Sequence, residues 1–158
     1  MSRVVAPLLV FGWGNPSRGD DALGPLLVEQ LASHAQASSG RLECLTDFQL
    51  QVEHALDLVG RERVLFVDAA IGLQTPFAVS EVRPAAVAGF TTHALSPEAL
   101  LQVYTELERT EPPPCTLLAI RAQRFELGEA PGEQALSDLA QALAWALAWA
   151  GLTQEIPA

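Results

Sequence analysis

Short apolar runs alternate with segments of helical periodicity along this sequence, and this alternation constrains the fold more than any other feature. The run PLLVF at 7–11 leads into the glycine-rich segment 12–14, and the run VLFV at 64–67 ends at Asp68. Continuous apolar runs of this length are typical of strands buried on both faces of a sheet. Between them, leucine and valine residues at 23–31 recur with the period of a helix. The pattern predicts a parallel sheet covered by helices.

The remaining segments continue the alternation. We expect further strands at 41–46, 77–82 and 115–120, and further helices at 52–58, 96–108 and 137–150. A proline follows the segment 77–82, which favours an edge position. Ser96, Pro97 and Glu98 form a typical helix start, with an N-cap, a proline in the first turn and an acidic residue near the positive end of the helix dipole. The predicted fold is a three-layer α/β/α sandwich of the phosphorylase/hydrolase-like type, with a twisted, mostly parallel sheet of about five strands in a single domain, 1–158.

Composition excludes several classes of partner. The chain has 158 residues, of which 9 are basic, all arginine, and 19 are acidic, so the net charge is -10. Nucleic acids and anionic membrane surfaces bind basic footprints, so we expect neither as a partner. The apolar stretch 139–152 is shorter than the roughly 20 residues of a membrane span. Two cysteines and no basic-then-apolar leader favour a cytoplasmic protein without a disulfide framework.

Polar side chains that could bind a ligand lie in three of the predicted loops. Asp20 and Asp21 end the first loop, Asp68 follows the run VLFV, and His93 lies in the loop before the Ser96 helix. Ligands bind at the carboxyl ends of strands in sheets of this kind, so we expect these loops to share a rim. Two carboxylates and an imidazole suit a borderline divalent metal such as nickel, zinc, cobalt or manganese. Taken one by one, the same residues also fit helix caps, turns and a surface histidine.

Other notable side chains are expected to have structural places. We expect His34 and His54 to lie at the surface. Cys44 and Cys115 are expected to be structural, since neither cysteine has a Cys-x-x-Cys partner. Trp145 and Trp149 are four residues apart, which puts them on one helix face. Core packing is favoured for them over a docking surface or a self-association patch.

Three segments resemble motifs of the C-terminal processing endopeptidases of [NiFe]-hydrogenase large subunits, peptidase family M52. Residues 12–24, GWGNPSRGDDALG, are similar to the family's G-x-G-N-P-x-R-G-D-D/E-G-x-G. Residues 66–69 resemble its V-D-A motif, and residues 92–97, THALSP, resemble its T-H-x-x-S-P. The resemblance covers about 8–136, with the motifs in the family's order. Ala22 stands where the family usually has glycine, and alanine is the better helix former.

This resemblance implies an endopeptidase that removes the C-terminal extension of a [NiFe]-hydrogenase large-subunit precursor after nickel insertion, which activates the hydrogenase. The resemblance implies that the catalytic groups and metal ligands are Asp21, Asp68 and His93. It also implies that Asp47, Asp20 and Asn15 contact the substrate, and that Asp20 supports its loop. The nickel is expected to arrive with the precursor rather than to be held permanently. The enzyme is expected to be a cytoplasmic monomer with this precursor as its partner.

Three other functions stay open at this point. A nickel-binding chaperone or recognition module would use the same three ligands without cleaving a peptide. Peptidyl-tRNA hydrolases resemble the chain in their G-x-G-N-P opening and sandwich fold, but the acidic charge opposes tRNA binding, and the histidine that closely follows this loop in those enzymes is absent. A Rossmann-like phosphate site would need glycine at Ser17, and Asp20 and Asp21 would repel a phosphate.

Overall fold

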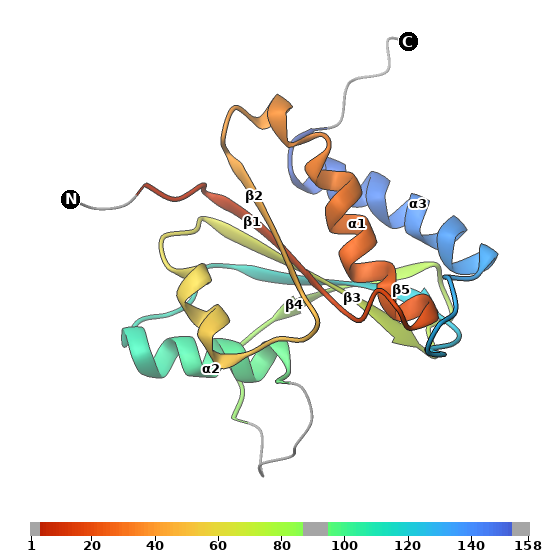
Figure 1. The fold of residues 1–158 in the computed structure, drawn as a ribbon. Coiled ribbons are helices and arrows are strands. Elements are labelled where there is room, and N and C mark those ends of the chain that lie inside the picture. The colour runs from red at the N-terminus through yellow and green to blue at the C-terminus, as the bar shows by residue number, and fades with distance from the viewer. Residues whose placement is uncertain (1–3, 87–94, 153–158) are drawn as a thin grey trace.

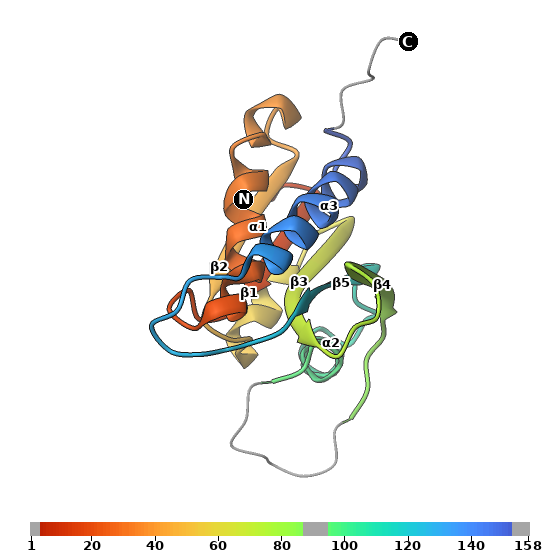
Figure 2. The same ribbon diagram turned by 90° about the vertical axis from the view of Figure 1, so that its right-hand side faces the viewer.

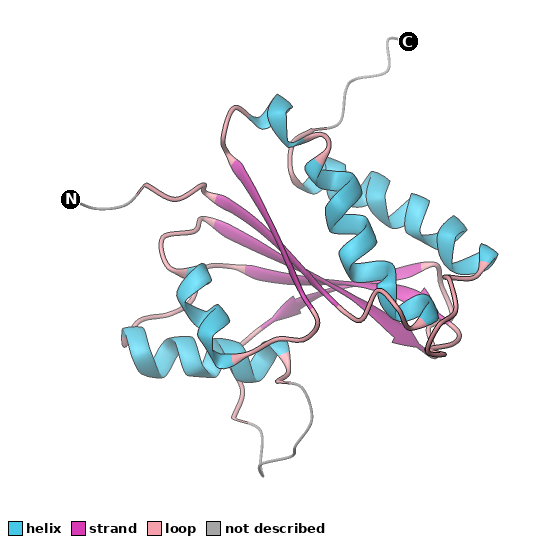
Figure 3. Ribbon diagram, in the orientation of Figure 1, coloured by secondary structure: helices cyan, strands magenta, loops and turns pink. Residues whose placement is uncertain are grey.

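Residues 4–86 and 95–152 are described in a computed structural model of the chain. Helices cover both faces of a central sheet, as the alternating pattern predicts (Figures 1 and 3). The strands are β1 Leu8–Trp13, β2 Leu42–Asp47, β3 Arg63–Ile71, β4 Phe77–Val82 and β5 Cys115–Ala122. The α-helices are α1 Leu23–Ala32, α2 Pro97–Glu108 and α3 Glu133–Trp149, and the 3-10 helices are η1 Gly19–Ala22, η2 Ala35–Ser38 and η3 Val52–Leu58.

Parallel pairing brings the carboxyl ends of four strands to one rim of the sheet. The strand order is β2-β1-β3-β5-β4, and only β4 within this sheet runs antiparallel to its neighbour. Its edge position confirms the expectation drawn from the proline that follows it. Because β1 and β2 end beside Val67 of β3, the loops that follow β1 and β2 and the last residues of β3 are neighbours in space although they are far apart in sequence.

The two faces of the sheet bury separate apolar clusters. Leu8 and Val10 of β1 face the cluster beneath α1 and α3, whereas Leu9 and Phe11 face the cluster beneath α2 and η3. Successive side chains of a strand point to opposite faces, so a strand covered by helices on both sides must be apolar throughout. This requirement explains the continuous apolar run at the start of the chain, and Figure 2 shows the helices on the two sides of the sheet.

The last helix, α3, begins earlier than the sequence pattern indicates. It starts at Glu133, after Gly132 as N-cap, and not at Ser137. The polar residues of its first turn obscure the apolar period there. Trp145 and Trp149 are partly buried against the cluster beneath α1 and α3, which agrees with the expected core packing. Within 4–86 and 95–152, no helix is long and apolar enough to cross a membrane.

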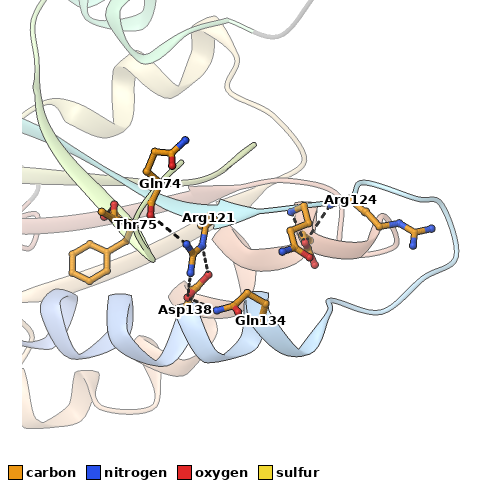
Figure 4. Close-up of polar contacts among 9 residues, drawn as sticks. Gln74, Thr75, Arg121, Arg124, Gln134 and Asp138 are labelled. Atoms are coloured by element: carbon orange, nitrogen blue, oxygen red, sulfur yellow. Dashed lines mark hydrogen bonds and ion pairs between the residues drawn. The ribbon is translucent and has the colours of Figure 1, made fainter. Parts of the chain in front are cut away.

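An ion pair between a buried carboxylate and a partly exposed arginine fastens α3 to β5 (Figure 4). Asp138 is fully buried, and its two carboxylate oxygens accept hydrogen bonds from Nε and Nη2 of Arg121 at 2.9 and 3.1 Å. The side-chain amide of Gln134 donates to the same carboxylate at 3.0 Å. Paired donors of this kind offset the cost of taking a carboxylate out of water. The pair therefore ties the first part of α3 to β5.

Gly24 allows α1 to start against the ends of β1 and β3. A Cβ at this position would lie 2.6 Å from the carbonyl oxygen of Trp13 and 2.9 Å from that of Val67. Both distances are too short for real contacts, and both neighbours are backbone atoms of the sheet, which cannot easily move. The close approach places the turn before α1 directly at the rim.

We expect Gly24→Ala to destabilise the protein by about 1–3 kcal/mol, because the added methyl group would force the helix away from the sheet. Helix propensity alone predicts the opposite sign, a gain of about 1 kcal/mol. Urea denaturation of the variant measures the difference. Gln30→Ala, exposed on the same helix, is the control and should stay within about 0.5 kcal/mol of the wild type. An unchanged or raised free energy of unfolding for Gly24→Ala would contradict the close approach.

Candidate active site

The loop after β1 turns sharply and delivers Asp21 to the rim. The backbone N–H of Asn15 donates to Oδ2 of Asp21 at 2.8 Å, which closes the loop on itself. Gly14 has φ +148, and a Cβ there would overlap the carbonyl oxygen of Asp21. Only glycine fits at this position. Ala22 has φ -73, an ordinary helical value, so alanine replaces the family's usual glycine without backbone strain.

Asp68 lies at the same rim, within β3 and not after it. The sequence predicted a strand ending at Val67, but pairing with β5 continues to Ile71, whereas pairing with β1 stops where Gly12 faces Val67. Asp68 therefore stands at the first position of β3 beyond its contact with β1. Its Oδ1 accepts the N–H of Ala69 at 2.8 Å.

The electrostatics of Asp68 link it to Asp21. Burial raises the pKa of the Asp68 carboxyl from 3.8 to about 7, and the negative charge of Asp21 adds to this rise. The N–H of Ala69 and the side chain of Trp13 act in the opposite direction, because they favour the charged form. Two of the three residues of the predicted ligand set thus lie close enough for their charges to interact. A carboxyl with a pKa near neutrality is suited to exchange protons at physiological pH.

The third residue of the set, His93, lies outside the described residues. The chain is described again from Leu95, and the predicted helix start follows directly. Oγ of Ser96 accepts the N–H of Ala99 at 3.1 Å, and Pro97 occupies the first turn of α2. Among the described residues, no group of three histidine, cysteine or acidic side chains is arranged to hold a metal ion. The complete ligand set with His93 therefore stays a prediction.

Asp20 has a different place from its neighbour Asp21. It is 4% exposed, and its carboxylate accepts backbone N–H groups from Gln123 at 2.7 Å, Arg124 at 3.3 Å and Gly132 at 2.9 Å. These donors belong to the loop between β5 and α3, which lies beside the loop after β1 in Figures 1 and 2. Its oxygens point into this pair of loops, which agrees with the supporting role of Asp20. Its contact with a substrate stays a prediction.

Asp47 ends β2 at the same rim, opposite Trp13 of β1. Its Oδ1 accepts the N–H of Phe48 at 2.7 Å, and its Oδ2 lies 3.2 Å from Nε2 of His54. The expected surface position of His54 is wrong, since its side chain is only 13% exposed and its ring centre lies 4.5 Å from that of Phe11. Two partners from other segments, a phenyl ring and a carboxylate, hold the histidine in place. The local sequence, with the polar and exposed Glu53 directly before the histidine, does not reveal this environment.

His34, Cys44 and Cys115 lie as expected. His34 is exposed. Both cysteines are free, and burial raises the pKa of Cys44 to about 11 and that of Cys115 to about 12, so neither thiol ionises at neutral pH. Asn15 lies at the rim, where its side-chain oxygen accepts the N–H of Ser17 at 2.9 Å. These thiols are structural, and the polar side chains with candidate chemical roles lie at the rim.

Comparison with solved structures identifies the class of fold. The sequence matches no protein-family model, and no curated protein matches it as a relative. The fold, in contrast, is that of the [NiFe]-hydrogenase maturation proteases, as the motif resemblance implied.

Three solved structures illustrate this likeness. The maturation protease HycI from Thermococcus kodakarensis KOD1 is 20% identical, with a TM-score of 0.69, over 93% of this chain and 92% of that one. The maturating endopeptidase HybD from E. coli is 19% identical, with a TM-score of 0.68, over 90% of both chains. The hydrogenase 2 maturation peptidase from Thaumarchaeota archaeon SCGC_AB-539-E09 is 24% identical, with a TM-score of 0.65, over 92% of this chain and 99% of that one. At these identities the likeness establishes a shared fold.

Asp20→Ala is expected to lower the free energy of unfolding by about 2–3 kcal/mol, because it leaves buried backbone N–H groups of the β5–α3 loop without an acceptor. Chemical denaturation measures this loss. Asp21→Ala is the matched control, because it removes the neighbouring carboxylate, which accepts one backbone N–H and repels Asp68. An equal loss in the two variants would contradict the supporting role of Asp20.

The raised pKa of Asp68 makes it a source of pH-dependent instability. Because its folded-state pKa of about 7 lies above the ordinary value of 3.8, the folded protein binds the extra proton between these values, and stability falls as pH rises through that window. We expect Asp68→Asn to match the wild type near pH 4 and to exceed it by on the order of 2 kcal/mol at pH 8. Denaturation of both proteins across this range measures the difference. A difference independent of pH would show that the carboxyl is not perturbed.

Proposed function

We propose that this chain is the endopeptidase that removes the C-terminal extension of a [NiFe]-hydrogenase large-subunit precursor and so activates the hydrogenase. The observation that supports this most directly is the pair Asp21 and Asp68, which interact at one rim of the maturation-protease fold. They occupy the acidic positions of two family motifs in this sequence. The solved structures named above, which share this fold, are hydrogenase maturation peptidases.

Hydrolysis of an amide needs an activated water molecule and an acceptor for its proton. Either the nickel or a carboxylate that does not bind it would activate the water, and Asp68, whose pKa lies near neutrality without metal, is suited to accept the proton in the second case. Asp21, fixed by the N–H of Asn15, presents a second carboxylate beside it. Together with His93, these residues form an O/O/N set that fits the nickel carried by the precursor, which would supply Lewis acidity when bound. Cleavage would then follow nickel insertion, because the set engages only a loaded precursor.

The remaining features of the proposal concern the setting of the reaction. We infer a monomer that acts in the cytoplasm, on a protein partner and not on nucleic acid or a membrane surface. The free cysteines are compatible with a reducing compartment. The net charge of -10 opposes binding to nucleic acids. The enzyme needs no permanently bound metal, since the nickel belongs to its substrate.

We expect Asp21→Asn, Asp68→Asn and His93→Gln each to leave the nickel-loaded precursor uncleaved, because each removes one member of the proposed set. The assay incubates purified protein with nickel-loaded and nickel-free precursor and measures the intact mass of the product. The wild type should cleave only the loaded form, and His34→Gln, at an exposed position, should cleave like the wild type.

The outcomes separate the competing functions. Normal processing by all three variants would refute the site assignment. Nickel-dependent binding of the precursor by the wild type without any change in mass would instead favour a recognition module or chaperone.

A further inference from the structure

The strand β4 presents a free edge near the proposed catalytic pair. It is the last strand in the order β2-β1-β3-β5-β4, and it pairs with β5 along its whole length, from Phe77 to Val82. In Figure 2 no described helix or strand lies beyond it. An edge strand has a row of backbone N–H and C=O groups that point away from the sheet, and these groups can pair with another extended segment.

The register identifies the residues whose backbone groups point outward. The N–H of Arg121 donates to the carbonyl oxygen of Pro76 at 2.9 Å, so residue 76 is bonded toward β5. Positions in an antiparallel pair alternate between bonded and non-bonded, so the N–H and C=O groups of Val79 and Glu81 face the free edge. Within the described part of the chain, no backbone group of another segment bonds to them there.

Proteins usually protect an edge strand against pairing with other chains, and β4 lacks most of the usual devices. No proline lies within Phe77–Val82, the pairing with β5 continues without a bulge, and the single charged side chain, Glu81, lies near the end. Val79 is 42% exposed and is β-branched, which suits a strand. The opposite edge strand, β2, has two carboxylates, at Glu43 and Asp47. Strand addition is therefore favoured at β4.

Pairing positions relate this edge to the proposed catalytic pair. Asp68 pairs with Ala119 of β5, and Ala119 pairs with Ala78 of β4. Because neighbouring strands are about 4.8 Å apart, a further strand on the free edge would lie about 14 Å from the backbone of Asp68. An extended chain rises about 3.3 Å per residue, so about four or five residues would connect the two positions.

The direction of β4 indicates which part of a substrate fits. It runs antiparallel to β5, so it begins at the rim and leads away from it. A polypeptide that leaves the scissile bond at the rim would follow β4 in the same direction. The C-terminal extension of the precursor has this course, and its free end can lie along an edge without threading. Parallel pairing is slightly weaker per residue than antiparallel pairing, which suits a segment that must be released after cleavage.

A hollow of about 620 Å³ lies where β4 leaves the sheet. It is lined by residues 81–84, by Thr105 of α2 and by residues 111–115, which include three consecutive prolines. Proline has a fixed φ and no N–H, so this wall is rigid. An extension that follows the six residues of β4 from the rim would reach the hollow after about ten residues. The edge and the hollow thus form one continuous path away from the rim.

We propose that the free edge of β4 binds the C-terminal extension of the precursor as a sixth, parallel strand of the sheet. This inference rests on the proposed function for the identity of the segment, but binding at the edge can be measured without cleavage. Main-chain pairing tolerates many side chains. The surface would therefore recognise an extended conformation at a set distance from the scissile bond.

Hydrogen exchange followed by mass spectrometry tests what occupies the edge. The nickel-loaded precursor is bound to Asp21→Asn, which should leave it uncleaved, and the control is the same large subunit without its extension. We expect the amide hydrogens of Val79 and Glu81 to exchange at least about tenfold more slowly in the complex with the precursor, and not in the control.

Two other results would overturn the proposal. One is unchanged exchange at β4 in the complex, with or without protection of β2. The other is protection of β4 in the protein alone that grows with its concentration, because it would assign the edge to a second copy of the chain.

Val79→Pro removes one outward N–H and keeps the hydrogen bonds to β5, because proline is tolerated on an edge strand where the N–H faces solvent. We expect it to weaken precursor binding about tenfold or more. Val79→Ala keeps the N–H and should weaken binding no more than about threefold. Gln30→Ala, exposed on α1, should bind within about twofold of the wild type. Unchanged binding by Val79→Pro would refute the proposal, provided that exchange at β5 remains that of the folded protein.

A cleavage assay separates this inference from the proposed function. With the nickel-loaded precursor, Val79→Pro should raise KM by about tenfold while kcat changes less, because the edge binds a part of the substrate that does not react. A precursor whose extension is shortened to about four residues should show a similar rise, and Val79→Pro should add nothing to it, because both changes remove the same contact.

The outcomes of this assay differ for the two proposals. Cleavage by the wild type with an unchanged KM for Val79→Pro would overturn the edge site and leave the peptidase function intact. Protection of β4 by a loaded precursor that the wild type never cleaves would overturn the peptidase function and leave the edge site.

Discussion

Parallel pairing of β1, β2 and β3 is the constraint on which the rest of this structure depends. Strands that run in the same direction need crossover connections, and here these connections are helices that cover both faces of the sheet. The same pairing places the ends of β1 and β2 beside Asp68 of β3 at one rim. Asp21, Asp47 and Asp68 therefore become neighbours at one rim because of strand direction, without any direct bond between them.

Acidic residues at this rim have different properties because their partners differ. Asp20 is buried and receives backbone N–H groups from a distant loop, so its charge is satisfied and it holds that loop in place. Asp68 receives little compensation, and its pKa rises to about 7 because of burial and the charge of Asp21. Asp47 is fixed but accessible. A buried support, a carboxyl with a raised pKa and an accessible carboxylate thus arise from the same side-chain chemistry in three environments.

Stability and reactivity are opposed at this site. Two neighbouring carboxylates, one of them poorly solvated, cost free energy, and this cost is met elsewhere by the apolar clusters on the two faces of the sheet and by the loop contacts of Asp20. Gly14 and Gly24 contribute in another way, since they allow the backbone to approach the rim more closely than any other residue would. The candidate site is therefore an electrostatically unfavourable region on a well-packed support.

The sequence alone determined the elements, the fold class and the acidic residues of the rim, because apolar periodicity and short motifs are local properties of a chain. Local patterns missed the continuation of β3 past Val67, which depends on β5, and the early start of α3. They also misplaced His54, whose environment comes from Phe11 and Asp47. Only the tertiary structure decided which acidic residue supports a loop and which stays accessible, because burial and hydrogen-bond partners are supplied by segments far away in the sequence.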